Sequence, residues 1–327
     1  MSTKSTGADA PLLEVEDLSI EFRTRSGVVH ALDRVGLALD TGETLAVVGE
    51  SGSGKSVTAY AVMALLDPAA RITSGRIAFK GADLLASGES RRLPRQGAFA
   101  MIFQNPRSAL NPIRPVGRQI ADVLMRHAGL GRGAALRQAV EVLAQVRIPD
   151  PERRARAYPF ELSGGMCQRI MIAMALSCKP ALLLADEPTT GLDVTTQAVI
   201  MALLDEQAKA QGMATVLITH DLALASEHAD RIAVMHAGQV VETAPTAELL
   251  AAPRHPYTRS LIAATPVPAA SLATLAAVPG GLPDLRRDDL PSCRYSARCP
   301  RYDVACDGRV PLEQLSPRHA VACRHPL

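Results

Sequence analysis

The stretch Gly49-Glu50-Ser51-Gly52-Ser53-Gly54-Lys55-Ser56 joins an apolar run, Thr44 to Val48, to a run rich in Ala, Met and Leu, Val57 to Leu66. An apolar β-type run, a glycine-rich turn and a helix-favouring run in this order predict a strand, a loop and a helix. The eight residues fit the pattern Gly-x-x-x-x-Gly-Lys-Ser in the structural context that gives the pattern its meaning. The stretch therefore predicts a phosphate-binding loop at the start of a βα unit.

Each residue type in this loop has a chemical reason to be there. Glycines let backbone N–H groups close around phosphate oxygens, and the N-terminus of the following helix favours negative charge. We expect Lys55 to reach the β and γ oxygens of ATP and Ser56 to ligate Mg²⁺. The alternative interpretation is a chance Gly/Ser turn, which the strand-to-helix context argues against.

A second element is Leu182-Leu183-Leu184-Ala185-Asp186-Glu187, an apolar run that ends in two carboxylates. In open α/β sheets, ligands bind at the carboxyl ends of the strands. We expect Asp186 to hold Mg²⁺, directly or through water, and Glu187 to orient the attacking water or accept its proton. Taken alone, the pair could be solvated acidic residues at a strand end. Together with the upstream loop, it completes a Mg-ATP site.

The remaining pattern predicts the α/β fold class. Leu12 to Phe22 and Val28 to Leu39 are β-rich and flank a turn-like segment, which predicts an antiparallel pair. Further apolar runs separated by helical stretches indicate a mostly parallel sheet; they are Phe99 to Phe103, Ala181 to Ala185, Ala214 to Ile218 and Arg231 to Met235.

Two changes in composition suggest internal boundaries. Between about residues 105 and 170 the chain becomes helical with proline punctuation, which predicts a helical subdomain inserted into the sheet domain. After about Leu261 it becomes rich in Pro, Gly and Arg, which marks a small irregular extension. We therefore expect an ATPase domain over 1–260 and an extension over 261–327.

Composition excludes several function classes. The 35 Lys and Arg residues nearly balance 33 Asp and Glu residues, so nothing indicates a nucleic-acid surface, which usually has a basic excess. The N-terminal stretch lacks the apolar core of a secretory signal, and the longest apolar stretch, Met171 to Ala185, contains Lys179 and Pro180. We expect a chain that does not cross a membrane by itself and that resides in a reducing compartment.

The stretch Leu162-Ser163-Gly164-Gly165-Met166 lies ahead of a helix-forming run and shortly before the acidic pair. Ser163 can cap a helix, and the glycines permit close approach of an anion, although a Ser-Gly-Gly cap is common by itself. Gln104 and His220 each follow an apolar run, and Asp193 lies in Gly191-Leu192-Asp193. In this order and spacing, the set resembles the signature, Q-loop, switch histidine and D-loop of ABC ATPases over roughly residues 12–250.

The resemblance implies a role for each of these residues. Gln104 would touch Mg²⁺ and the attacking water, His220 would contact the γ-phosphate, and Phe22 would stack on adenine. Taken singly, Gln104 and His220 could be ordinary polar residues at strand ends, and Phe22 a core aromatic in a strand. The ATP-binding set is Phe22, Gly49, Glu50, Ser51, Gly52, Ser53, Gly54, Lys55, Ser56, Gln104, Asp186, Asp193 and, toward a partner's nucleotide, Ser163, Gly164, Gly165 and Met166.

Local features narrow the resemblance to ATPases of the dipeptide, oligopeptide and nickel importers. They are Asn105-Pro106 after Gln104, Ser108 to Pro112, Gln168-Arg169 after the signature, and His255-Pro256-Tyr257-Thr258. One departure is Cys167, where many relatives carry a polar residue; the ordinary interpretation of Cys167 and Cys178 is a buried, inert thiol. The branch implies uptake of peptides, with nickel or another small solute as the alternative cargo.

The family also implies partners and a location. Two ATPase subunits dock head to tail, so that each ATP lies between one chain's phosphate loop and the other chain's signature. In this branch the second ATPase is commonly homologous but not identical. We therefore expect that second subunit, two transmembrane permease subunits and an extracytoplasmic binding protein, with this chain peripheral on the cytoplasmic face of the bacterial inner membrane.

Two other function classes fit less well. A soluble ABC ATPase acting on DNA or ribosomes would need long coiled-coil arms or a second cassette, and the 108 positions from Lys55 to Ser163 hold no heptad pattern. A non-catalytic, nucleotide-sensing cassette would lack the residues for hydrolysis, whereas Glu187 and His220 are both present.

Four of the six cysteines lie in the extension with spacing C-x5-C-x6-C-x16-C: Cys293, Cys299, Cys306 and Cys323. A segment with so little apolar periodicity needs a staple, and four thiolates suit either Zn²⁺ or an iron-sulfur cluster. Zinc sites favour closer pairs, which favours a 4Fe-4S cluster, as similar extensions in dipeptide-importer ATPases are understood to hold. Zinc and free or oxidised thiols remain the alternatives. A structural role would leave ATP affinity at Lys55 intact.

Overall fold

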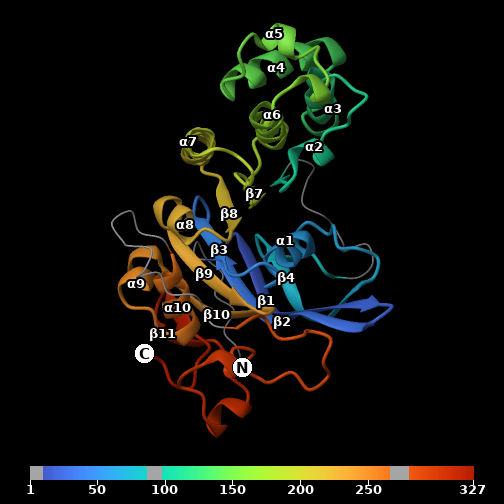
Figure 1. The fold of residues 1–327 in the computed structure, drawn as a ribbon. Coiled ribbons are helices and arrows are strands. Elements are labelled where there is room, and N and C mark those ends of the chain that lie inside the picture. The colour runs from blue at the N-terminus through green and yellow to red at the C-terminus, as the bar shows by residue number, and fades with distance from the viewer. Residues whose placement is uncertain (1–9, 87–97, 266–279) are drawn as a thin grey trace. The chain divides into compact units, whose positions relative to one another are not determined.

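The computed structural model describes residues 10–86, 98–265 and 280–327. The chain divides into two compact units, one formed by residues 1–91 with 217–327 and the other by residues 92–216 (Figure 1). Each unit has its own buried apolar residues. Among the described helices, none is both long and apolar enough to cross a lipid bilayer.

The first unit opens with an antiparallel sheet. Strands β1 (Leu13–Thr24) and β2 (Gly27–Leu39) pair antiparallel, as the sequence predicts. Two strands that the sequence reading did not identify extend the sheet in the order β2-β1-β4-β5: β4 (Ala70–Phe79) and β5 (Ala82–Asp83). The first half of β4 is largely exposed and lacks an apolar alternation, so its pattern gives a weak strand signal.

The second sheet of this unit is mixed. Strand β3 (Thr44–Val48) pairs in parallel with β9 (Arg231–His236), and β9 pairs antiparallel with β10 (Gln239–Pro245). Both β3 and β9 are almost entirely buried, which explains their continuous apolar runs. This unit also contains the helices α1 (Lys55–Val62), α8 (Leu222–His228), α9 (Thr246–Ala251) and α10 (Pro256–Ala264), while β8 (Ala214–Thr219) crosses the division between the units.

The extension adds strands to the edge of this mixed sheet. Strand β12 (His319–Val321) pairs antiparallel with β10, and β11 (Glu313–Ser316) pairs antiparallel with β12. The rest of residues 280–327 consists of loops and two short 3₁₀ turns, Ser296–Arg298 and Val304–Asp307. Segment 266–279 of the extension lies outside the described residues. Residues 280–327 are therefore mostly irregular but anchored by strand pairing.

The second unit combines a parallel strand pair with helices. Strands β6 (Phe99–Ile102) and β7 (Leu182–Asp186) pair in parallel. Its helices are α2 (Pro106–Ala109), α3 (Val116–His127), α4 (Arg132–Gln145), α5 (Pro151–Arg154), α6 (Gly164–Leu176) and α7 (Val194–Gln211). Fully buried Ile120, Leu143 and Ile170 come from α3, α4 and α6, which pack together and are drawn in green and yellow-green in Figure 1. The α/β class with antiparallel and mixed sheets is confirmed.

Candidate nucleotide site

The phosphate loop runs from the end of β3 to α1 (Lys55–Val62), which begins two residues earlier than predicted and ends four residues earlier. Ala64 adopts a left-handed conformation with φ 54°, which stops the helix before Leu66. At its other end, Gly54 has φ 100°, a conformation that side chains other than glycine rarely adopt. The strand, loop and helix of the sequence prediction are confirmed.

Glycine is also needed where the loop leaves β3. A Cβ atom on Gly49 would lie 2.1 Å from the carbonyl oxygen of Met235 on β9, and Gly49 itself has φ 152°. The loop is held further by Gly238, whose N–H donates to the carbonyl of Ser53 over 2.8 Å. The backbone of the loop is therefore fixed by close contact with β9 and the turn that follows it.

Lys55 is the charged group of this loop. Its side chain is buried, and its Nζ donates to the carbonyl oxygens of Gly49 over 2.8 Å and Glu50 over 2.9 Å. An ammonium held inside a loop at a helix N-terminus, followed by the half-buried hydroxyl residue Ser56, is a donor set that suits phosphate and Mg²⁺. The residues present therefore fit a Mg-nucleotide.

The carboxylate pair lies in the second unit, at the end of β7. Asp186 is 2% exposed, whereas Glu187 is half-buried and has the left-handed φ of 47°. Oε2 of Glu187 accepts hydrogen bonds from Nε2 of Gln104 and from Oγ1 of Thr190, each over 2.8 Å. The structure thus brings Gln104 and Glu187 together and adds Thr190, which the sequence reading missed although it lies three residues after Glu187.

The signature residues begin α6 of the same unit. Ser163 is exposed and caps the helix, since its Oγ accepts from the N–H of Met166 over 3.3 Å. A Cβ on Gly165 would lie 3.2 Å from the methyl carbon of Thr196, whose Oγ1 donates to Asp193 over 2.7 Å. Hydrogen bonds from the backbone and side chain of Thr196 lower the pKa of Asp193. Thr196 therefore lies beside Gly165 and is hydrogen-bonded to Asp193.

The remaining residues singled out from the sequence are Cys167, Phe22 and His220. Cys167 is fully buried in α6, and burial raises the pKa of its thiol, which fits the inert interpretation. Phe22 is half-buried in β1, opposite Val29 of β2 and Ala70 of β4, and His220 is an exposed residue after β8. Adenine stacking by Phe22 and phosphate contact by His220 stay predictions.

The four cysteines of the extension line one small cavity. Cys306 is buried, and Cys293, Cys299 and Cys323 are half-buried. Burial raises the pKa of Cys293 to about 11, and the other three sulfurs add to the increase. Four sulfur donors at one cavity suit a thiolate-bound metal centre.

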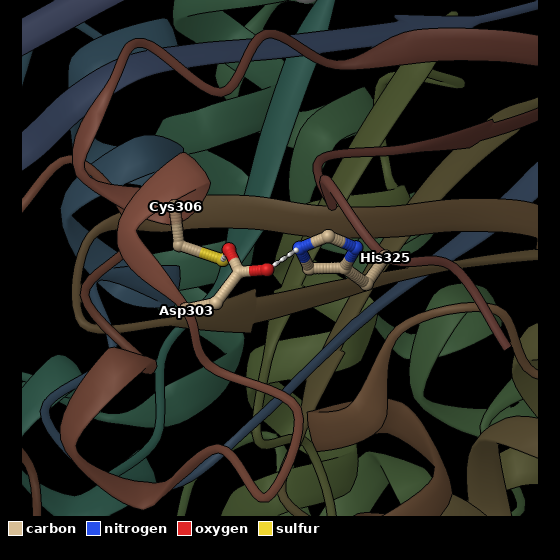
Figure 2. Close-up of side chains that lie close together, drawn as sticks. All are labelled: Asp303, Cys306 and His325. Atoms are coloured by element: carbon tan, nitrogen blue, oxygen red, sulfur yellow. Dashed lines mark hydrogen bonds and ion pairs between the residues drawn. The ribbon is translucent and has the colours of Figure 1, made fainter.

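Two non-cysteine ligand types that the sequence reading missed lie at the same place. Figure 2 shows Asp303 and His325 beside Cys306, with the ligand atoms of all three within 4.8 Å of one another. Asp303 pairs with Nε2 of His325 over 2.9 Å. The sequence signal for both was their closeness to cysteines, three residues before Cys306 and two after Cys323.

Comparison with known proteins identifies the family. The chain matches the model of the ABC transporter family over residues 32–190 and that of the oligopeptide/dipeptide transporter C-terminal region over residues 241–306. It is 45% identical to the dipeptide transport ATP-binding protein DppD of Escherichia coli K12, covering 97% of each chain. It is 44% identical to DppD of Bacillus subtilis 168, covering 95% of this chain and 94% of that one.

Solved structures agree with the fold. The ATP-binding cassette MJ0796, a dimer bound to ADP and phosphate, matches 72% of this chain and 98% of its own with a TM-score of 0.62 and 26% identity. The protein cbiO1 of Clostridium perfringens, part of the ABC transporter complex cbiONQ, matches 74% of this chain and 92% of its own with a TM-score of 0.62 and 27% identity. This chain belongs to the ATP-binding proteins of the ABC transporter family, in the group with the oligopeptide/dipeptide transporter C-terminal region.

Proposed function

We propose that this chain is the ATP-hydrolysing subunit of a membrane importer for dipeptides or oligopeptides. The observation that carries the proposal is the identity of 45% over nearly the whole chain, C-terminal region included, with a dipeptide transport ATP-binding protein. Nickel or another small solute is the alternative cargo. It lacks a specific observation in its favour.

Hydrolysis follows from the donors and acceptors of the two units. Lys55 would bind and orient the β and γ phosphates. Ser56, Asp186 and Gln104 are the residues that would hold Mg²⁺, which would offset phosphate charge. Glu187 orients the attacking water and accepts its proton. Gln104 and Thr190 fix the direction of the Glu187 carboxylate by donating to its Oε2.

The signature implies a second subunit, because Ser163 presents the start of α6 to solvent. An exposed, capped helix N-terminus with two glycines can hold the phosphate of a nucleotide bound elsewhere. We propose that this nucleotide belongs to a homologous ATPase docked head to tail. Two permease subunits and an extracytoplasmic binding protein complete the importer, with this chain on the cytoplasmic face of the bacterial inner membrane.

The test is co-expression with candidate permease subunits and a second ATPase, followed by reconstitution into liposomes. We expect uptake of a labelled dipeptide that requires ATP and the binding protein, with a turnover far above that of the isolated monomer. Glu187→Gln in this chain serves as the inactive control. Full-rate hydrolysis by a monomer confirmed by light scattering would overturn the two-subunit site, and nickel uptake without peptide uptake would replace the cargo.

We further propose that Cys293, Cys299, Cys306 and Cys323 hold a 4Fe-4S cluster that staples the extension. The support is their position around one cavity in a segment with few regular elements. The competing centre is a single metal ion, such as zinc, that binds Cys306 together with Asp303 and His325. The cluster would need Cys293, Cys299 and Cys323 in addition to Cys306, but neither Asp303 nor His325.

Anaerobic purification followed by iron, sulfide and zinc analysis separates these centres. The cluster predicts about four irons and four sulfides per chain, lost in Cys293→Ser and retained in His325→Ala. Stoichiometric zinc that survives Cys293→Ser but is lost in His325→Ala would assign the mixed site instead. Absence of every metal would overturn both.

A further inference from the structure

The C-terminal extension reaches the phosphate loop through an ion pair. Arg298, the last residue of a 3₁₀ turn in the extension, lies with its Nη1 3.0 Å from Oε1 of Glu50. The Arg298 side chain is 6% exposed and that of Glu50 is 28% exposed. Water therefore screens this pair less than an ordinary surface pair, and removing either partner should have a measurable effect.

Aromatic side chains fix the position of Arg298. Its guanidinium carbon lies 5.5 Å from the ring centroid of Tyr295 and 6.0 Å from that of Tyr257, within the range of cation–π attraction. Nη1 also lies 3.1 Å from Nε2 of His236, which must accept because a guanidinium only donates. These contacts hold the guanidinium in place beside Glu50.

The backbone groups of Glu50 take part in several hydrogen bonds of the phosphate loop. Its carbonyl accepts from Nζ of Lys55 over 2.9 Å and from the N–H of Ser53 over 3.2 Å. Its own N–H donates to the hydroxyl of Tyr257 over 3.2 Å. A displacement of Glu50 would therefore move the loop backbone and the lysine together.

Other residues of the extension contact the same region. Leu282 lies beside Gly52 of the loop, since a Cβ atom added to Gly52 would be 3.5 Å from Cδ1 of Leu282. Arg294 donates to the carbonyl of Ala237, and the next residue, Gly238, donates to the carbonyl of Ser53 over 2.8 Å. The extension thus supports the loop at Glu50, Gly52 and, through Gly238, at Ser53.

We propose that Arg298 is a positioning residue for the phosphate loop, so that the C-terminal extension sets the nucleotide affinity of this subunit. Arg298 holds Glu50 in place and balances a carboxylate that would otherwise repel the nucleotide's phosphates. A loop already in its binding conformation loses less entropy when nucleotide binds. The proposal rests on the nucleotide site of the proposed function but not on the metal centre.

The test measures ATP binding to the full-length isolated chain by calorimetry with Mg²⁺, in the Glu187→Gln background to prevent turnover. Arg298→Met removes the charge and keeps much of the side-chain volume, and we expect it to raise Kd about five- to tenfold. Arg298→Lys keeps a charge and should recover part of the loss. The control is Arg287→Met, because Arg287 pairs with exposed Asp289 inside the extension; its Kd should stay unchanged.

A double-mutant cycle separates positioning from general destabilisation. When Glu50→Gln is already present, adding Arg298→Met should change Kd by less than about twofold, since Arg298 acts through Glu50. In the assembled importer, Arg298→Met should raise KM for ATP and leave kcat within about twofold. Thermal midpoints of all variants are recorded alongside.

Each outcome has a definite meaning. An unchanged Kd in Arg298→Met, with or without a lower thermal midpoint, would overturn the proposal, and so would additive effects in the cycle. If the chain with wild-type Lys55 bound ATP no better than Lys55→Ala, the nucleotide site itself would fail, which is a failure of the proposed function. Binding that is lost in Lys55→Ala and weakened in Arg298→Met supports both.

Discussion

Gln104 and Glu187, 83 residues apart in sequence, are joined by a hydrogen bond of 2.8 Å from Nε2 to Oε2. Gln104 follows β6 and Glu187 follows β7, and these two strands pair in parallel. The carboxyl ends of neighbouring parallel strands meet at one edge of a sheet, so the pairing brings the two side chains together. The amide thereby fixes the direction of the carboxylate that we propose activates water.

Replacing the carboxylate should separate binding from hydrolysis. We expect Glu187→Gln to retain ATP affinity and to slow turnover by a factor of about 10² or more, because an amide cannot accept the proton of water. Calorimetric ATP titration and phosphate release in the assembled importer measure the two effects. Turnover equal to that of the unaltered protein would remove Glu187 from the role of base.

A milder effect is expected from the second donor to Glu187. Thr190→Val removes the Oγ1 hydrogen bond but keeps the shape of the side chain. The carboxylate keeps its bond to Gln104, so kcat should fall by less than about tenfold while KM for ATP stays constant. A change in KM alone would indicate that Thr190 acts on binding instead.

The contact between Gly49 and Met235 predicts a stability effect. Gly49→Ala places a methyl group 2.1 Å from a backbone oxygen and at φ 152°, so β3 and β9 must separate. We expect a loss of about 3 kcal/mol or more in the free energy of unfolding. Gly36→Ala in β2 is the matched control, because its Cβ would lie 3.8 Å from the nearest atom. Equal denaturation midpoints for the two variants would contradict this.

The buried imidazole of His236 predicts a pH dependence. Burial, with the nearby charge of Arg298, lowers the pKa of His236 to about 3. The His236 imidazole therefore binds a proton more tightly in the unfolded chain than in the folded one. Its contribution to the free energy of unfolding is fully present above about pH 6.5 and is lost as pH falls toward 3. His236→Phe should reduce the slope of unfolding free energy between pH 6.5 and 5 by up to about 1.4 kcal/mol per pH unit. An unchanged slope in denaturant titrations would refute this.

The metal centre that we propose at the four cysteines is expected to influence nucleotide binding. Cys299 follows Arg298 directly, so loosening the extension at Cys299 should release the Arg298–Glu50 pair. Cys299→Ser should weaken ATP binding in the same direction as Arg298→Met, contrary to the expectation from sequence that ATP affinity would stay intact. Cys178→Ser, in the other unit, is the control. Loss of metal with unaltered Kd would restore the earlier expectation.

Sequence alone determined the local elements of the site. The loop Gly49–Ser56 and the strand ending at Asp186 were recognisable because a phosphate site needs particular residue types at fixed spacing, all within a few residues. The buried strands β3 and β7 were predictable because burial on both faces demands a continuous apolar run. The end of α1 was less predictable, since Ala64 adopts a left-handed conformation that its residue type does not signal.

Only the tertiary structure decided which distant residues meet. Arg298 and Glu50 are 248 residues apart, and neither residue type indicates the other, because their contact depends on how the extension packs against β9 and α10. The pairing of β12 with β10 is similar: three residues carry too little pattern to specify a partner strand. The residue types that a phosphate site needs lie within short stretches of sequence and can be recognised there. The support of the phosphate loop by the extension arises from packing between segments that only folding brings together.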